Sequence, residues 1–523
     1  MDGATSLMNR VNVGDMLART ARRCPSAPAV ADGERRLTYR GLNEWVNRVA
    51  NGLAALGYGR GTALGLMSRN GIEFLVTYFA CAKLGIACVP INLLWRGGEL
   101  GYVLRHAGVR GVVVEAVLLP DLATALGELP GLLVIVVGGD GVGTDHVDFA
   151  GFDRADAGEP NAAVDDRDPL SYLYTSGTTS APKGVVSSHL AVYIQSLGNV
   201  IETGLKQTDR VSALLPMFHT AQLNSLCTPA VAIGACIHVL KAFDAVLLLD
   251  MIERERLTVV FGLPMMYRAL LDEQTARPRD VSSLRLAIYA MAPMPDHELR
   301  RLIEVFDCGF SLMFGQTEMS PTASFFRPEH QLSHPGAVGT PCVNVEIGVM
   351  GPVGALLPTG DVGEIVYRSP QVMSGYLHDP EATREAFRDG WLHSGDAGHF
   401  DADGILWFAD RFKDVIKSGG ENVASIEVEK ALFAAEPAIA EVAVVGLPHP
   451  HWIEAITAIV VARTDQTVEP DALLQKLRTH LSPFKCPKAV IVVDSLPRTA
   501  TGKVQKATLR QVHARHYEQA AGS

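Results

Sequence analysis

The amino-acid sequence predicts an α/β fold with a large N-terminal domain of stacked α/β subdomains, a small β-barrel-like subdomain and a small, mobile α+β C-terminal domain. The length of 523 residues exceeds what a single hydrophobic core usually organises. Helical stripes alternate with short apolar runs along the first part of the chain, which is typical of layered α/β proteins. After residue 336 the pattern changes to Gly/Pro turns and short alternating strands, which predicts a separate β unit.

The first half of the chain contains the alternating elements. Helical patterns cover residues 42–56 and 72–84, on either side of a strand pattern at residues 63–67. Further strand-type runs follow at residues 109–115, 132–137, 170–175, 211–215, 259–261, 284–289 and 311–314. Several of these runs end in loops of small or polar residues. Because ligands of open α/β sheets collect at the carboxyl ends of strands, a binding site is expected there.

The second half predicts the smaller units. Residues 336–408 form the expected β-barrel-like subdomain, and the charged segment 410–414 (DRFKD) then interrupts the pattern. We interpret this segment as a hinge between an N-terminal domain of residues 1–409 and a C-terminal domain of residues 415–523, which has a usual domain size. Helices are expected in the C-terminal domain at residues 426–433 and 471–481, and strands at 442–445, 456–461 and 489–493.

Composition excludes some classes of protein. The formal net charge of −11 gives no basic surface to neutralise phosphates, so no nucleic-acid partner is expected. The eight cysteines form no CxxC pair and indicate reduced thiols of a cytoplasmic protein. The first residues contain an early acid and no apolar core of a secretory signal.

Residues 211–240 contain no Asp, Glu, Lys or Arg, a length that a membrane-spanning helix could need. Pro216, His219, Gln222, Asn224 and Pro229 interrupt the segment, and such groups are costly in hydrocarbon. A buried strand, loop and helix are therefore expected here, and no integral membrane segment.

Residues 174–184 (YTSGTTSAPKG) are the most informative segment. A strand leads into a loop of glycines and hydroxylated residues that closes with Lys183. Glycines let backbone N–H groups approach an anion, the hydroxyls donate hydrogen bonds, and the lysine supplies a positive charge. The pattern differs from a Walker A loop, which needs Gly-Lys-Ser/Thr at the start of a helix. It predicts a phosphate-binding loop of another kind.

This segment resembles the signature of the adenylate-forming superfamily, which includes acyl- and aryl-CoA ligases, peptide-synthetase adenylation domains and beetle luciferases. Ser180 stands where the usual pattern has Gly, and further motifs follow in the family's order from about Ser26 to Lys506. The resemblance implies an AMP-forming acid–CoA ligase, which forms a carbon–sulfur bond. A carboxylic acid and ATP would give acyl-AMP and pyrophosphate, and the acyl group would then pass to CoA. ATP, Mg²⁺ and CoA are the implied cofactors.

The resemblance also implies which residues bind ATP and the metal. Glu318 would hold Mg²⁺ and Thr317 would contact the α-phosphate, and Mg²⁺ does prefer carboxylate together with phosphate oxygens. Asp396 would bind both ribose hydroxyls, with Arg411 near the ribose. Lys413 would lie at the pivot of the hinge. The remaining nucleotide-binding residues implied are Thr175, Ser176, Gly177, Thr178, Thr179, Lys183, Ala292, Pro293, Phe314, Gly315 and Gln316.

Two lysines of the C-terminal domain are implied to serve different half-reactions. Lys503, in residues 497–503 (PRTATGK), matches the lysine that bridges the substrate carboxylate and the α-phosphate during adenylation, where developing charge needs a cation. Lys417, in residues 416–423 (IKSGGENV), matches the segment that faces the site after the domain rotates. Gly419, Gly420 and Glu421 belong to this segment, and the paired glycines would let the pantetheine arm of CoA pass close to the backbone.

The acid pocket is expected from residues 216–224 and 336–339, together with Met313 and Phe314. His219 is interpreted as either a gate of the acyl channel or an ordinary core histidine. Residues 211–240 contain no acid to match an α-ammonium group, and an unpaired buried ammonium is very costly, so an amino acid is not expected as substrate. The absence of Arg and Lys disfavours a dicarboxylate.

Several alternatives remain beside this interpretation. Residues 132–143 end in glycines as a dinucleotide-binding turn would, but Thr144 stands where the third glycine is needed, and no amphipathic helix follows. An acyl-AMP ligase that loads a carrier protein and a luciferase-like monooxygenase share the adenylation step. A fatty acid is the first expectation for the substrate, with an aryl or alicyclic acid next. Assembly as a homodimer is left open.

Overall fold

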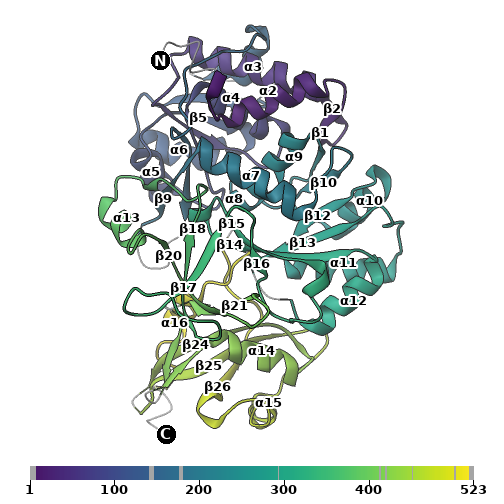
Figure 1. Cartoon of the computed structure of the whole chain (residues 1–523), viewed down its shortest axis with the longest axis vertical. Coiled ribbons are helices and arrows are strands. Elements are labelled where there is room, and N and C mark those ends of the chain that lie inside the picture. The colour runs from purple at the N-terminus through teal and green to yellow at the C-terminus, as the bar shows by residue number, and fades with distance from the viewer. Residues whose placement is uncertain are drawn as a thin grey trace.

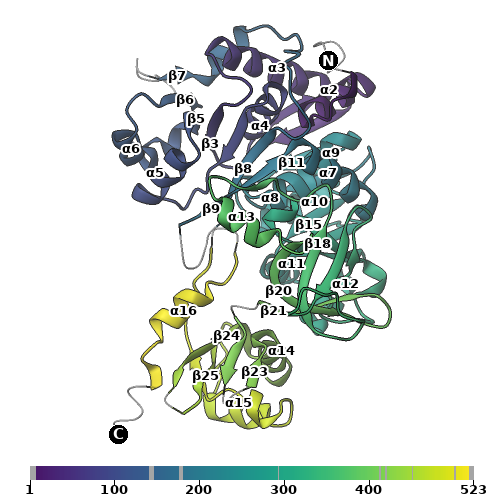
Figure 2. The ribbon, with the colours of Figure 1, turned by 60° about the vertical axis from the view of Figure 1, so that its left-hand side comes forward.

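The computed structural model places two large sheets and their helices above a smaller C-terminal unit (Figure 1). The structure describes residues 8–139, 146–175, 181–291, 294–411, 414–418, 421–449, 451–499 and 502–517. A turned view separates the C-terminal unit, with α14, α15 and β24, from the sheets above it (Figure 2). The predicted fold class is confirmed.

The first sheet has eight strands in the order β19-β9-β8-β4-β3-β5-β6-β7. Neighbours from β8 to β7 pair in parallel, whereas β9 and β19 add antiparallel strands at one edge. The bounds are β3 (Ala63–Met67), β4 (Ala87–Pro90), β5 (Val109–Glu115), β6 (Leu133–Val137), β7 (Val147–Asp148), β8 (Pro169–Thr175), β9 (Lys183–Ser188) and β19 (Gly375–Tyr376).

The second sheet has nine strands in the order β16-β15-β14-β13-β12-β10-β11-β1-β2. Its centre from β14 to β1 is parallel and both edges are antiparallel. The bounds are β1 (Pro28–Asp32), β2 (Arg35–Thr38), β10 (Arg210–Ala213), β11 (Cys236–Val239), β12 (Val259–Gly262), β13 (Leu286–Ala290), β14 (Gly309–Gly315), β15 (Thr322–Phe326) and β16 (Thr340–Pro341).

Helix α4 (Ile72–Leu84) forms a buried layer between the two sheets, since it packs against β1 of one and β3 and β4 of the other. Every residue of α4 except Glu73 is buried, which explains a pattern that is apolar all round. Lys83 is the charged exception: its ammonium bonds Asn43, Asn47 and Glu159 at 2.6–2.7 Å. A buried charge needs such partners.

Helix α7 (His189–Thr203) also contacts both sheets, through β9 and β15, and the other helices of the large domain pack around the two sheets. Their bounds are α2 (Val13–Arg23), α3 (Tyr39–Ala55), α5 (Gly97–His106), α6 (Leu119–Glu128), α7 (His189–Thr203), α8 (Thr220–Gln222), a π-helical turn (Leu223–Cys227), α9 (Thr228–Ile233), α10 (Ala245–Glu255), α11 (Pro264–Ala276) and α12 (Asp296–Phe306). Residues 211–240 form the buried strand, loop and helix that the sequence predicts. Among the described residues, none of the helices is long and apolar enough to cross a membrane.

The small β unit is a four-stranded antiparallel sheet in the order β17-β18-β20-β21. Its strands are β17 (Glu346–Met350), β18 (Gly363–Arg368), β20 (Leu392–Phe400) and β21 (Leu406–Arg411), and α13 (Pro380–Ala386) lies between β19 and β20 in the chain. Leu406 of β21 pairs with Gly339. This bridge fixes the small sheet against the segment that leads into β16.

The C-terminal unit has a five-stranded sheet in the order β23-β22-β25-β24, with β26 beside β25. The bounds are β22 (Ile416–Ser418), β23 (Glu421–Val423), α14 (Ser425–Ala435), β24 (Ile439–His449), β25 (Ile453–Ala462), α15 (Pro470–Leu477), β26 (Ala489–Val492) and α16 (Lys506–Val512). Separate apolar clusters cover the two faces of this sheet, so the unit has a core of its own.

Candidate active site

Two paired strands flank the expected phosphate-binding segment. Strand β8 ends at Thr175, β9 begins at Lys183, and these two residues are partners across the antiparallel pair. The Lys183 ammonium lies 4.9 Å from the centre of the Tyr376 ring. The rest of the expected cradle, Ser176, Gly177, Thr178 and Thr179, lies outside the described residues. The strands nevertheless deliver Lys183 to the carboxyl end of β8, where the sequence predicts an anion site.

The segment from Phe314 to Glu318 forms the end of β14 and a short 3₁₀ turn (Thr317–Met319). Gly315 has a φ of 154°, and a Cβ there would lie 2.0 Å from the Pro321 carbonyl oxygen. Only glycine therefore fits. The Gln316 N–H donates to the same carbonyl at 3.0 Å. This tight loop turns Thr317 and Glu318 away from the strand axis.

Neighbouring residues fix the Glu318 carboxylate. The Tyr376 hydroxyl donates to Glu318 Oε1 at 2.9 Å, and the Met373 N–H donates to the Glu318 carbonyl at 2.8 Å. The buried Gln371 amide donates to the carbonyls of Met319 and Thr322 at 2.7 and 2.6 Å. A single held carboxylate suits Mg²⁺ whose other ligands are phosphate oxygens and waters. No cluster of three metal-binding side chains occurs among the residues described.

The expected adenosine contacts lie at two strand ends. Strand β13 ends at Ala290, and Met291 follows with a φ of 71°, while Ala292 and Pro293 lie outside the described residues. On the small sheet, Asp396 of β20 and Arg411 of β21 are cross-strand partners and form an ion pair at 3.2 Å. Asp396 is buried. The pair brings an anion and a cation to one place, as the resemblance implies for the ribose.

A small cavity lies where the acid pocket is expected. Its walls are Leu215, Pro216, His219, Ala221, Gln222 and Met291. The His219 Nδ1 accepts a hydrogen bond from the Ala221 N–H at 3.2 Å. Burial, and then the positive charge of Lys503, lower the pKa of His219 to about 4. The imidazole is therefore neutral at physiological pH.

The polar groups behind this cavity bond to one another. Gln222 Oε1 accepts from the N–H groups of Leu214 and Leu215. The Tyr78 hydroxyl donates to Asn224 Oδ1 at 3.1 Å, and the Asn224 amide donates to Thr220 Oγ1 at 3.0 Å. These bonds satisfy the buried amides, so the face turned to the cavity is uncharged and largely apolar.

The two lysines of the C-terminal domain have different surroundings. Gly502 has a φ of 82°, and a Cβ there would lie 2.5 Å from Leu263 Cδ1 of the large domain. This contact brings the next residue, Lys503, to the site, where its charge acts on His219. Lys417 is exposed on the β22–β23 hairpin, together with Glu421. Lys413, Gly419 and Gly420 lie outside the described residues.

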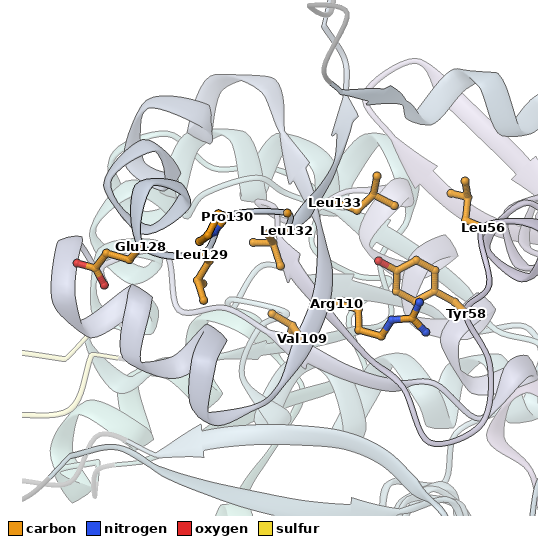
Figure 3. A pocket seen from close by; sticks show the side chains of 10 residues that line it. Leu56, Tyr58, Val109, Arg110, Glu128, Leu129, Pro130, Leu132 and Leu133 are labelled. Atoms are coloured by element: carbon orange, nitrogen blue, oxygen red, sulfur yellow. The ribbon is translucent and has the colours of Figure 1, made fainter.

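A larger concavity of about 460 Å³ opens elsewhere, beside β5 and β6. Figure 3 shows Tyr58 and Arg110 at one end and Glu128 at the other, with leucines and Pro130 between them. None of the expected nucleotide or acid contacts lies among its lining residues. The larger of these two concavities is therefore not where the nucleotide and acid contacts are expected.

Comparison with known proteins identifies the family. Residues 17–377 match the AMP-binding enzymes, and residues 427–503 match the C-terminal domain of AMP-binding enzymes. The chain is 36% identical over 507 residues to a feruloyl-CoA synthase from Amycolatopsis sp, covering 96% of this chain and 99% of that protein. It is 33% identical over 511 residues to an indoleacetate–CoA ligase from Aromatoleum aromaticum, covering 97% and 99%.

Solved structures agree with this result. The anthranilate CoA ligase AuaEII in complex with anthranoyl-AMP matches with a TM-score of 0.90 at 29% identity, covering 99% of this chain and all of that one. The chain therefore belongs to the adenylate-forming family of AMP-binding enzymes. The prediction of an AMP-forming acyl-CoA synthetase with ATP, Mg²⁺ and CoA as cofactors is confirmed.

The structure adds residues that the sequence analysis did not single out. Tyr376, Gln371 and Met373 hold Glu318 and the loop that follows it. They come from residues 371–376, more than 50 positions after Glu318 in the chain. The polar Gln371 and the aromatic Tyr376 in a Gly/Pro-rich stretch were the available signal, but a turn-rich β unit explains the same pattern. The specific roles of the site residues stay predictions.

Proposed function

We propose that this enzyme activates an aryl or arylalkyl carboxylic acid that carries no charge besides its carboxylate, forms the acyl-adenylate, and transfers the acyl group to CoA. The observation that carries the proposal is the cavity beside His219, whose described lining residues are largely apolar and include no carboxylate or cationic side chain. An acid with a second charge would lose its hydration in that cavity without gaining a partner.

The arrangement of cations supports adenylation as the first step. Lys183 is delivered by the phosphate loop and Lys503 by the C-terminal domain, so the two approach the site from different domains. A carboxylate oxygen would attack the α-phosphorus of ATP, and pyrophosphate would leave. Both reacting groups are anions, and Lys503 would reduce their repulsion while compensating charge in the transition state. Glu318 would hold Mg²⁺, which supplies further neutralisation of the phosphates when bound.

His219 contributes shape and neutrality rather than charge in this proposal. Because its pKa is lowered to about 4, it stays uncharged over the working pH range. Its Nδ1 is engaged with the Ala221 N–H, which orients the ring along the cavity wall. A neutral ring beside the substrate carboxylate leaves Lys503 as the cation that acts on it.

The choice of an aromatic acid as substrate is supported by the names of similar proteins. Three matching proteins are named for ferulate, indoleacetate and anthranilate, all acids with an aromatic ring. Another, a ligase of Mycobacterium tuberculosis, is named for long-chain fatty acids. Since three of these four names refer to ring-bearing acids, a fatty acid is the second candidate.

A panel of acids in matched pairs tests the proposal through acid-dependent pyrophosphate release. We expect 3-phenylpropanoate to be used and phenylalanine, which adds only the ammonium group, to be refused. Benzoate should likewise exceed terephthalate, which adds only a carboxylate, and cinnamate-type acids should exceed palmitate. Preference for phenylalanine or terephthalate would contradict an uncharged pocket, and preference for palmitate would select the second candidate.

The acceptor is tested separately. Acyl transfer from the adenylate to CoA should exceed transfer to a phosphopantetheinylated carrier protein at equal concentration. Higher transfer to the carrier protein would identify the chain as a carrier-loading ligase instead.

A further inference from the structure

Tyr376 touches two charged residues of the site at once. Its hydroxyl donates to Glu318 Oε1 at 2.9 Å, and the centre of its ring lies 4.9 Å from the Lys183 ammonium. The first contact orients a carboxylate, and the second is an attractive contact between a cation and an aromatic ring. One side chain therefore links the expected metal ligand to the expected phosphate ligand.

The backbone of Tyr376 is fixed from two sides. In β19, Tyr376 is the partner of Val185 in β9, two residues after Lys183, and the next residue, Leu377, donates its N–H to the Gly184 carbonyl at 2.8 Å. On the other side, the Tyr376 N–H donates to Thr383 Oγ1 of α13 at 2.9 Å. The ring thus keeps a constant position relative to the strand that carries Lys183.

Lys183 and Glu318 share this neighbour and form no ion pair with each other. Among the described residues, no carboxylate lies within ion-pair distance of the Lys183 ammonium, while the aromatic ring does contact it. A direct Lys183–Glu318 pair would cancel both charges before ATP arrives, and ATP binding would have to break it. An aromatic face attracts the ammonium without neutralising it.

The phenol is suited to this place because its O–H donates to the Glu318 carboxylate. That bond uses one lone pair of Glu318 Oε1 and leaves further acceptor positions on the carboxylate.

We propose that Tyr376 is a positioning residue that orients Glu318 for the metal and holds Lys183 for the phosphates, while keeping the two opposite charges apart. The proposal rests on the roles assigned above to Lys183 and Glu318. Two parts of the side chain have separate roles, since the hydroxyl contacts Glu318 and the ring contacts Lys183.

Tyr376→Phe tests the hydroxyl alone. The Mg²⁺ concentration that gives half-maximal ATP binding, measured by titration calorimetry, should rise about tenfold, the size expected from losing a hydrogen bond to a charged group. The affinity for ATP at saturating Mg²⁺ should stay within about twofold, because the ring remains beside Lys183. An unchanged Mg²⁺ requirement would overturn the proposal for the hydroxyl.

Tyr376→Leu tests the ring in addition. ATP affinity at saturating Mg²⁺ should now fall about fivefold below that of Tyr376→Phe, since the cation–ring contact is lost and Lys183 can approach Glu318. KM for ATP should rise with it, whereas KM for the acid should not change. Equal ATP affinities of the Phe and Leu variants would overturn the proposal for the ring.

Two controls separate this result from folding and from the proposed function. Tyr193→Phe removes a hydroxyl from α7, where it contacts Arg19, and should leave Mg²⁺ and ATP binding unchanged at the same thermal midpoint. Glu318→Gln should raise the Mg²⁺ requirement. If Glu318→Gln shifts it and Tyr376→Phe does not, the Tyr376 proposal alone is wrong. If neither shifts it, the metal role of Glu318 is wrong too.

Discussion

Lys503 and Lys417 belong to the same C-terminal domain but face different surroundings. The Lys503 corner contacts the large domain through Gly502 and Leu263, and its charge acts on His219 in the acid pocket. The Lys417 side chain is exposed on the β22–β23 hairpin, and its N–H donates to Glu454 of the same domain at 2.7 Å. If the two lysines have the roles that the resemblance implies, this orientation is the one for adenylation, and a rotation of the domain would bring Lys417 to the site for thioester formation.

Contacts along the seam between the domains hold this orientation. Glu298 of α12 binds Arg268 of the large domain at 3.0 Å and Arg463 of the C-terminal domain at 2.9 Å. Arg268 also donates to the Ala440 carbonyl at 3.2 Å. These contacts between described residues of the two domains are polar, as we expect for a domain that rotates between the two half-reactions.

The largest expected effect on the reaction comes from removing the Lys503 side chain. Lys503→Ala removes the cation that we expect to reduce repulsion between the carboxylate and the α-phosphate, so acid-dependent ATP–pyrophosphate exchange should fall by roughly a hundredfold or more. Lys506→Ala is no suitable control, because Lys506 bonds the Ser425 hydroxyl and Glu429 at the hinge side. Lys476→Ala on α15, with an exposed ion pair to Glu436, should retain the wild-type rate. Exchange above one tenth of wild type would remove Lys503 from this role.

An intermediate effect comes from loosening the seam. Arg463→Ala removes the bond to Glu298 without touching either lysine, and should lower pyrophosphate exchange about three- to tenfold, as expected for a partly exposed ion pair beside a buried carboxylate. Transfer from preformed acyl-AMP to CoA should not fall, because the orientation being weakened is the one for adenylation. The matched control is Arg300→Ala. Arg300 lies on α12, the helix that carries Glu298, but its ion pair is with Asp296 of the same helix. If Arg463→Ala reduced both half-reactions equally, the contact would not be specific to the orientation for adenylation.

A separate effect, on stability rather than on rate, distinguishes the two domains by pH. Burial lowers the pKa of His189, His219 and His238 to about 4, and all three lie in the large domain. Because these folded-state values are below the ordinary value near 6.5, their contribution to stability is present above pH 6.5 and is lost as pH falls toward 4. Each of the three histidines should therefore lower the free energy of unfolding by about 1–2 kcal/mol between pH 7 and pH 5.

Hydrogen exchange read separately on peptides of each domain measures this effect. Opening of the large domain should become easier between pH 7 and 5, after correction for intrinsic exchange rates, with less change in the C-terminal domain. His189→Gln should reduce the pH dependence in the large domain. The same pH dependence in both domains would contradict this assignment.

Sequence patterns predicted most of the scaffold because the signals there are local. The strands β3 and β5 and helix α4 coincide with the expected ranges, since uninterrupted apolar runs bounded by turns define them. The strand expected at 211–215 ends earlier, at Ala213, where Leu214 and Leu215 donate instead to Gln222. These bonds to a side chain take the place of strand-to-strand hydrogen bonds, and the pattern of apolar residues in the sequence does not reveal them.

The site was predictable as a set of motifs but not as an arrangement. Lys183 and Glu318 stand out by their motifs, whereas their common neighbour Tyr376 depends on how β19 pairs with β9. The hinge side shows the same limit. Asp410 accepts from the Ser425 N–H and hydroxyl at 2.5 and 2.7 Å, which caps α14, and no local pattern in the chain relates those two residues.

We propose that the two lysines serve different half-reactions from different faces of one domain. Single-turnover transfer from purified acyl-AMP to CoA, compared between Lys417→Ala and Lys503→Ala, tests it most directly. We expect Lys503→Ala to transfer at a rate close to wild type and Lys417→Ala to transfer markedly more slowly, with the order reversed for pyrophosphate exchange. If both variants lost the same fraction of both half-reactions while remaining folded, the division of labour between the two faces would be contradicted.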